Sequence, residues 1–146
     1  MLDTSVLVAA FRSSFGASAE LLRHVIDGTI KVLCSVALAA EYRAVLLRPE
    51  HLAAAHMSVE EAELILEAIE ALAIEVHIYI STRPATRDAD DDFVWDTVVN
   101  GQADALVTLN KRDFAAAGKH FTVPVLTPQE VLMTLVKGER NGATKA

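Results

Sequence analysis

Four segments of the chain carry acids or an amide beside apolar runs, and such side chains are oxygen ligands for metal ions. The residues are Asp3, Glu41, the acids of residues 88–92, Asn110 and Asp113. Hard divalent cations such as Mg²⁺ and Mn²⁺ take oxygen ligands, and a cluster of unpaired carboxylates is unfavourable without a cation. If the fold brings these segments together, they predict a divalent metal site.

Other catalytic patterns are absent from the sequence. There is no glycine-rich phosphate loop, no G-x-G-x-x-G and no nucleophile elbow, which argues against kinases, ATPases, dinucleotide-binding enzymes and serine hydrolases. The five histidines show no metal-ligand spacing. A phosphatase with an aspartyl nucleophile would need a second aspartate two residues after Asp3, where the chain has Ser5.

Composition limits the class of protein and its partners. With 146 residues, 52% of them apolar, the chain can form one domain with a buried core. Its net charge of −7 means that any nucleic acid must be held by a few local basic residues. Cys34 is the single cysteine, so no intramolecular disulfide is available, and a reducing cytoplasmic setting is expected. Neither a signal peptide nor a membrane-spanning segment is predicted.

The elements that would position the acids alternate between strand and helix patterns. Short apolar runs predict strands at residues 31–35, 74–80, 105–108 and 122–126, and residues 6–8 suggest a strand end that runs into a turn or helix. Helical spacing predicts helices over 36–47, over 58–72, over 94–100 and from Pro128 onward, and a further one that Ser18 caps and Gly28 ends. The alternation predicts an α/β fold whose parallel strands carry the site at their carboxyl ends.

Two further expectations concern the helices and the end of the chain. In residues 58–72, Ser58 and Glu61 form the pattern of a capping box. The residues of this helix expected to face the core are Leu64, Ile65, Ala68, Ile69 and Leu72. After Val136 the chain loses its apolar residues. We therefore expect one domain over residues 1–136 and a polar, frayed tail over residues 137–146.

The motifs around the acids resemble those of the PIN-domain family. The matching stretches are LDTSVLV at residues 2–8, EYRAVLLRP at 41–49, DADDDFVWD at 88–96 and NGQADALVTLN at 100–110. The resemblance points especially to the ribonuclease toxins of bacterial toxin–antitoxin pairs. It implies a three-layer α/β sandwich with a central, mainly parallel sheet flanked by helices, and a ribonuclease that depends on Mg²⁺ or Mn²⁺.

Position by position, the resemblance implies that Asp3, Glu41 and Asp91 are the catalytic acids and also bind the metal. Thr4 or Ser5 matches the hydroxyl residue beside the first acid, where it would contact substrate. In that family a fuller first strand usually precedes the first aspartate, whereas two residues precede Asp3 here.

The fourth acid of the family commonly falls where this chain has Asn110. Asparagine offers an oxygen ligand without charge, so the site should hold a second cation less well. Asp92, Asp96 or Asp113 would compensate for the missing charge, and spacing does not choose among them. The departure keeps open a second interpretation, a catalytically weakened PIN-like module that binds RNA or a protein partner without cleaving.

Partners follow from the same resemblance. RNA would meet the basic residues nearest the motifs, namely Arg12, Arg48, Lys111 and Arg112. As a toxin, the chain would be held in check by a small antitoxin protein. The apolar faces of its helices would also allow a homodimer.

Overall fold

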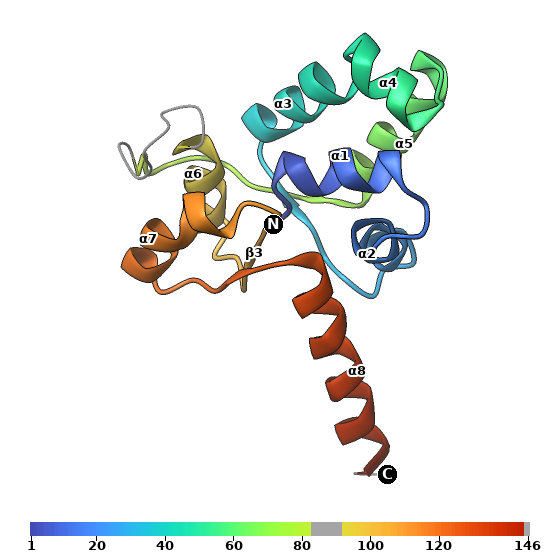
Figure 1. Cartoon of the computed structure of the whole chain (residues 1–146). Coiled ribbons are helices and arrows are strands. Elements are labelled where there is room, and N and C mark those ends of the chain that lie inside the picture. Colours follow the sequence, from blue (N-terminus) through green and yellow to red (C-terminus); the bar gives the residue numbers. More distant parts are fainter. Residues whose placement is uncertain (83–91, 145–146) are drawn as a thin grey trace.

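The computed structural model describes residues 1–82 and 92–144, and Figure 1 shows their arrangement. The helices are α1 (Thr4–Arg12), α2 (Ala17–Ile26), α3 (Val36–Leu46), α4 (Pro49–Ala55), α5 (Val59–Leu72), α6 (Asp92–Asn100), α7 (Lys111–Phe121) and α8 (Pro128–Thr144). The strands are β1 (Leu33–Cys34), β2 (Ile74–Glu75), β3 (Leu106–Val107) and β4 (Val125–Leu126).

The strands pair in parallel, as expected, but they are much shorter than the apolar runs suggest. β1 pairs with β2 and β3 pairs with β4, and an isolated parallel bridge joins Leu2 to Val107. The described residues thus form two separate parallel pairs instead of the one central sheet that the sequence predicts. At that bridge the N–H of Asp3 donates to the carbonyl oxygen of Val107 at 2.9 Å, and the N–H of Val107 donates to that of Met1 at 3.0 Å.

The strand predicted over residues 74–80 is also shorter than expected. Only Ile74 and Glu75 pair with β1. Farther along, Asn100 at the end of α6 accepts hydrogen bonds from the backbone N–H groups of Tyr79 and Ile80, each at 2.9 Å. A side chain therefore satisfies backbone groups that the alternating pattern assigned to a strand.

Helix ends agree with the local sequence signals in most cases. The capping box between Ser58 and Glu61 is present, and Gly28 has the positive φ of +85° that suits the residue after a helix. The predicted cap at Ser18 is wrong, because α2 begins at Ala17 with Gly16 as its N-cap and Ser18 is buried. Gly16 has the extended backbone that an N-cap position requires.

The core lies between the helices and the short strands, with Tyr42, Trp95 and Phe114 among its largest fully buried side chains. On α5 the buried stripe is Ala62, Leu66 and Ile69, whereas Leu64 is 67% exposed. The predictions for Leu64, Ala68 and Leu72 are therefore wrong, since Leu72 is 44% exposed and Ala68 is exposed as well, whereas the prediction for Ile69 is confirmed. The stripe that α5 presents to α2 and α3 follows the spacing of 62, 66 and 69, and Leu64 lies outside it.

Helix α8 packs against α2 and then extends away from the rest of the molecule (Figure 1). Its backbone is helical to Thr144, so the fraying expected after Val136 is not seen. Within residues 1–82 and 92–144, no helix is long and apolar enough to cross a membrane.

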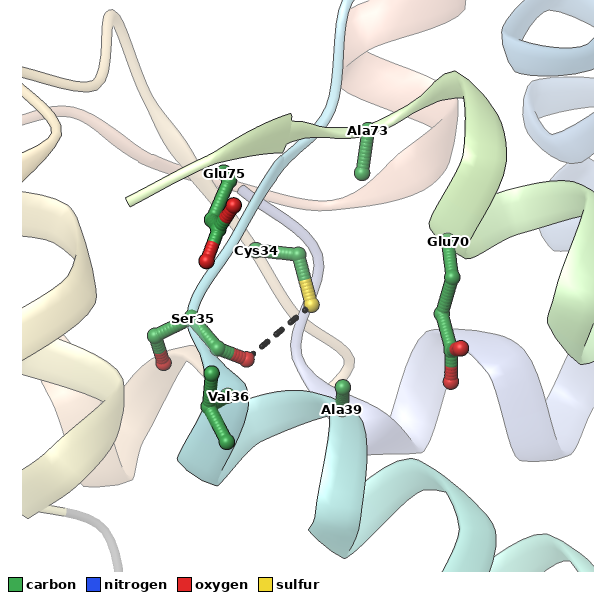
Figure 2. Close-up of a pocket in the computed structure, with 7 residues that line it drawn as sticks. All are labelled: Cys34, Ser35, Val36, Ala39, Glu70, Ala73 and Glu75. Atoms are coloured by element: carbon green, nitrogen blue, oxygen red, sulfur yellow. Dashed lines mark hydrogen bonds between the residues drawn. The ribbon is translucent and has the colours of Figure 1, made fainter. Parts of the chain in front are cut away.

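Cys34 lines a small cavity of about 190 Å³ at the end of β1 (Figure 2). The thiol donates a hydrogen bond to the carbonyl oxygen of Ser35 at 3.4 Å, and Glu70 of α5 lies across the cavity from it. Burial, and secondarily the charge of Glu70, raises the pKa of the Cys34 thiol to about 11. Cys34 is thus a free and buried thiol.

We expect the native protein to react with a thiol-specific disulfide reagent at pH 8 about tenfold more slowly than the unfolded protein. Raising the pKa by two units lowers the thiolate fraction about a hundredfold, and the greater nucleophilicity of a more basic thiolate offsets part of this. Since Cys34 is the single cysteine, the label reports on it alone. The raised pKa of the Cys34 thiol should also lower the free energy of unfolding as pH rises from about 9 towards 11, because the unfolded chain loses its thiol proton first. Equal labelling rates in buffer and in denaturant would contradict the prediction that the native thiol reacts slowly.

Candidate active site

A cavity of about 430 Å³ brings together residues from three separate parts of the chain. It is lined by α1 and the residue before it, by α3, and by the segment from the end of β3 into α7. The residues are Asp3, Thr4, Ser5, Val8, Ala9, Arg12, Glu41, Val45, Leu109, Asn110, Asp113 and Phe114. Three acids that the sequence singled out, from segments up to 110 positions apart, therefore line the same cavity.

Asp3 is the N-cap residue of α1, and only 7% of it is exposed. Its Oδ2 atom accepts hydrogen bonds from the hydroxyls of Ser5 at 2.7 Å and Thr108 at 2.8 Å. Within the described part of the chain, Oδ1 accepts no hydrogen bond. One oxygen of the carboxylate is thus fixed by the protein, and the other remains available as a ligand.

Glu41 reaches the cavity from the middle of α3. Its Oε2 atom accepts a hydrogen bond from the Thr4 hydroxyl at 2.5 Å, while Oε1 has no hydrogen-bond partner among the described residues. The next residue, Tyr42, is buried and donates its hydroxyl to the carbonyl oxygen of Leu2. Burial holds the pKa of the Tyr42 hydroxyl well above its usual value, so it remains a donor. Tyr42 thereby ties α3 to the residue directly before Asp3.

Thr108 is a site residue that sequence reasoning missed. It is fully buried at the end of β3, where its hydroxyl donates to Asp3 and accepts the backbone N–H of Asn110 at 3.0 Å. The Ser5 hydroxyl accepts the N–H of Leu109 at 3.2 Å and lies 3.5 Å from the Thr108 hydroxyl. The sequence feature that could have pointed to Thr108 is a hydroxyl residue directly after a short apolar run. Such a hydroxyl can join a strand end to the turn that follows.

Asn110 and Asp113 line the other side of the cavity. Asn110 is the N-cap residue of α7, but its side chain makes no capping hydrogen bond. Asp113 lies in the first turn of the same helix and is exposed. Both side chains are therefore at the positively polarised end of a helix, where oxygen ligands and negative charge are favourable.

The remaining acids of the prediction lie elsewhere or outside the described residues. Asp96 is buried in α6, where Oδ1 accepts from the backbone N–H and the hydroxyl of Thr82, at 2.6 and 2.8 Å. It does not line the cavity. Asp91 and the side chain of Asp92 lie outside the described residues. Among those described, no three His, Cys, Asp or Glu side chains lie close enough together to hold a metal ion.

Of the four basic residues predicted to meet substrate, Arg12 lines the cavity and the others do not. Lys111 forms an ion pair with Glu130 of α8, at 2.9 Å between Nζ and Oε1. That hydrogen bond, together with the charge of Lys111, holds the pKa of Glu130 below its usual value. Arg48, the N-cap residue of α4, and Arg112 in the first turn of α7 are both exposed.

Comparison with known proteins agrees with the motifs around these acids. A family model described as a PIN domain matches residues 1–112, which include α1, α3, β3 and the start of α7. Neither a curated protein nor a solved structure matches the chain. Because the model covers well over half of the 146 residues and contains Asp3, Glu41 and Asn110, the chain belongs to the PIN-domain family.

Proposed function

We propose that this protein is a ribonuclease that hydrolyses RNA phosphodiester bonds with Mg²⁺ or Mn²⁺, and that it is the toxin of a type II toxin–antitoxin pair in the cytoplasm. PIN domains are generally nucleases. The observation that carries the proposal is the cavity that Asp3, Glu41, Asn110 and Asp113 line together. A small antitoxin protein would then be the partner that restrains the activity.

The oxygen atoms that line the cavity are of the chemical type that binds a divalent cation. Asp3 and Glu41 each have one oxygen fixed by a hydroxyl and one without a hydrogen-bond partner among the described residues. Fixed carboxylates with a free oxygen are the usual ligands of Mg²⁺, which keeps waters or phosphate oxygens at its other positions. Asn110 would add a neutral oxygen. Asp91, which lies outside the described residues, is proposed as a third acid.

When bound, the cation supplies Lewis-acid chemistry, which activates water and neutralises charge on the phosphate. Asp3 and Glu41 would hold it through Oδ1 and Oε1. The hydroxyls of Ser5, Thr108 and Thr4 keep the two carboxylates from rotating. Asp113 is exposed beside the site, so its carboxylate is suited to accept the proton of the attacking water.

One specific observation favours a second candidate function. Asn110 lines the cavity at the position where an acid commonly falls in the family, which removes one negative charge from the ligand set. A PIN-like module weakened in this way would bind RNA or a protein partner without cleaving it. The two candidates differ in whether the protein cleaves RNA at any metal concentration.

The test is RNA cleavage by the purified protein with Mg²⁺, with Mn²⁺, and after metal removal by EDTA. A nuclease should cleave with either ion, lose cleavage with EDTA and regain it when excess Mg²⁺ or Mn²⁺ is added. Cleavage that persists in EDTA would contradict the metal dependence. No cleavage with either ion, together with retained RNA binding, would favour the binding module.

Replacing Asn110 with aspartate should raise the affinity for Mg²⁺ about tenfold, which corresponds to about 1.4 kcal/mol. The added charge attracts a divalent ion, but desolvation and repulsion from Asp3 and Glu41 offset much of the gain. Affinity is measured by calorimetry and from the Mg²⁺ dependence of cleavage.

The matched control is Ala71→Glu, which adds the same charge on the exposed face of α5, away from the cavity. If both variants change Mg²⁺ affinity equally, the effect is one of net charge. If Asn110→Asp leaves the affinity unchanged, Asn110 is not a ligand.

A further inference from the structure

Arg12 is the one basic residue among those that line the cavity in the described part of the chain. It lies in the last turn of α1, at the opposite end of that helix from Asp3. The acids Asp3, Glu41 and Asp113 make the cavity repulsive to a polyanion, and the net charge of −7 supplies no compensating attraction. A phosphate chain that enters the cavity therefore needs a local cation, and Arg12 is placed to supply it.

The guanidinium of Arg12 is held by a neutral partner. Its Nη2 lies 2.9 Å from Nδ1 of His51 in α4, a helix that packs against α1. Since a guanidinium can only donate, Nδ1 must accept, and the ring proton is then on Nε2. The contact fixes the direction of the side chain without neutralising its charge.

Other basic residues of the molecule are held differently. Arg43 forms two hydrogen bonds to the carboxylate of Glu70, at 2.9 and 3.1 Å, and Lys111 and Arg23 also pair with glutamates. Within residues 1–82 and 92–144, Arg12 has no acidic partner. Its remaining N–H groups are therefore free for a ligand, and a planar fork of donors fits two oxygens of a phosphate.

The position of Arg12 on α1 also limits which RNA phosphate its guanidinium can contact. Asp3 and Arg12 are nine residues apart on α1, which is about 14 Å along a helix axis. Because its contact with His51 turns the guanidinium towards α4, Arg12 is placed to meet a phosphate next to the one held at Asp3. We propose that Arg12, oriented by His51, forms a subsite for an RNA backbone phosphate that flanks the scissile one. This inference rests on the proposed ribonuclease function, and it assigns His51 as a positioning residue.

The test compares a dinucleotide with a ten-nucleotide RNA substrate. Arg12→Ala should raise KM for the longer RNA about tenfold, with a smaller effect on the dinucleotide and little change in kcat. The slope of log Kd against log salt for the longer RNA should become shallower by about 0.7. His51→Ala should raise KM for the longer RNA about threefold, and His51→Gln, which keeps an acceptor, should restore most of it. The matched control is His56→Asn, at the left-handed C-cap of α4 and away from the cavity.

Three results would overturn the subsite. These are an equal rise of KM for both RNA lengths, a fall of kcat with unchanged KM, or no effect of Arg12→Ala. Arg12→Lys keeps the charge and His51→Gln keeps the acceptor, and these variants are used if an alanine variant fails to fold, as judged by circular dichroism.

Binding of the longer RNA is also measured by fluorescence anisotropy in EDTA. A parent protein that binds but never cleaves would disprove the ribonuclease, whereas a parent that cleaves and an Arg12→Ala variant that binds equally well would disprove only the subsite.

Discussion

Replacing Asp3 with asparagine is expected to lower RNA cleavage at least about a thousandfold while the protein stays folded. Asparagine keeps a side-chain oxygen that can accept from Ser5 and Thr108, so the hydroxyl network survives. What is lost is the negative charge beside the cation. A thousandfold is about 4 kcal/mol, the Coulomb energy of two unit charges about 4 Å apart at an effective dielectric of about 20.

The measurement is kcat/KM for RNA at saturating Mg²⁺, with the unfolding temperature of the same sample. The comparison variant is Asp3→Ala, which should also lose activity but unfold earlier. Removing the carboxylate leaves the buried Thr108 hydroxyl without its acceptor, and such a loss costs about 1–3 kcal/mol. If Asp3→Asn cleaves RNA like the parent, Asp3 is not a ligand and the proposed site is wrong.

Replacing Glu41 with glutamine is expected to lower cleavage by about a hundredfold or more. Glutamine keeps an oxygen for the Thr4 hydroxyl but removes the charge of a half-buried carboxylate, so the loss should be smaller than at Asp3. The affinity for Mg²⁺, measured by calorimetry, should fall in parallel. A hundredfold corresponds to about 2.7 kcal/mol.

Two further variants test whether the loss of cleavage in Glu41→Gln comes from the role of Glu41 as a ligand. Thr4→Val removes the hydroxyl that orients Glu41 and should lower activity about tenfold, since groups that orient a metal ligand are typically worth 10–100-fold. Glu67→Gln makes the same chemical change on the exposed face of α5 and should leave activity as it was. Equal losses in Glu41→Gln and Glu67→Gln would mean that net charge, and not ligation, is responsible.

Local signals in the sequence predicted the helices α2, α3, α5, α6 and α8, but not α1, α4 or α7, and residues 6–8, which were expected at a strand end, lie inside α1. The capping box at Ser58 and Glu61 and the positive φ at Gly28 depend on residues within one turn of each other, so the sequence pattern contains what is needed. The paired strands could not be delimited in this way, because pairing depends on partners far along the chain. Ile78 and Ile80 continue the alternation of a strand, yet no strand pairs with them in the described residues.

The same contrast holds for the candidate site: a sequence shows the residue types, but it does not show which residues contact each other. Asp3, Asn110 and Asp113 were singled out because acids and amides at expected strand ends stand out in a sequence, and Glu41 because it begins a motif that resembles one of the family. The roles of Thr108 and His51 were not found, because a threonine after an apolar run and a surface histidine have common structural explanations. Only the fold shows that Thr108 bonds to Asp3 and that His51 bonds to Arg12.

The hydrogen bond from Thr108 to Asp3 also bears on when activity can arise during synthesis. The two residues are 105 positions apart, and at 5–20 residues per second a ribosome needs roughly 5–20 s to make the intervening chain. Throughout this interval the growing polypeptide carries Asp3 without Thr108, Asn110 or Asp113, so the cavity does not yet exist. If the proposed nuclease activity resides in this cavity, a nascent chain of this length cannot cleave RNA, and the proposed antitoxin would need to act only on molecules whose synthesis has passed α7.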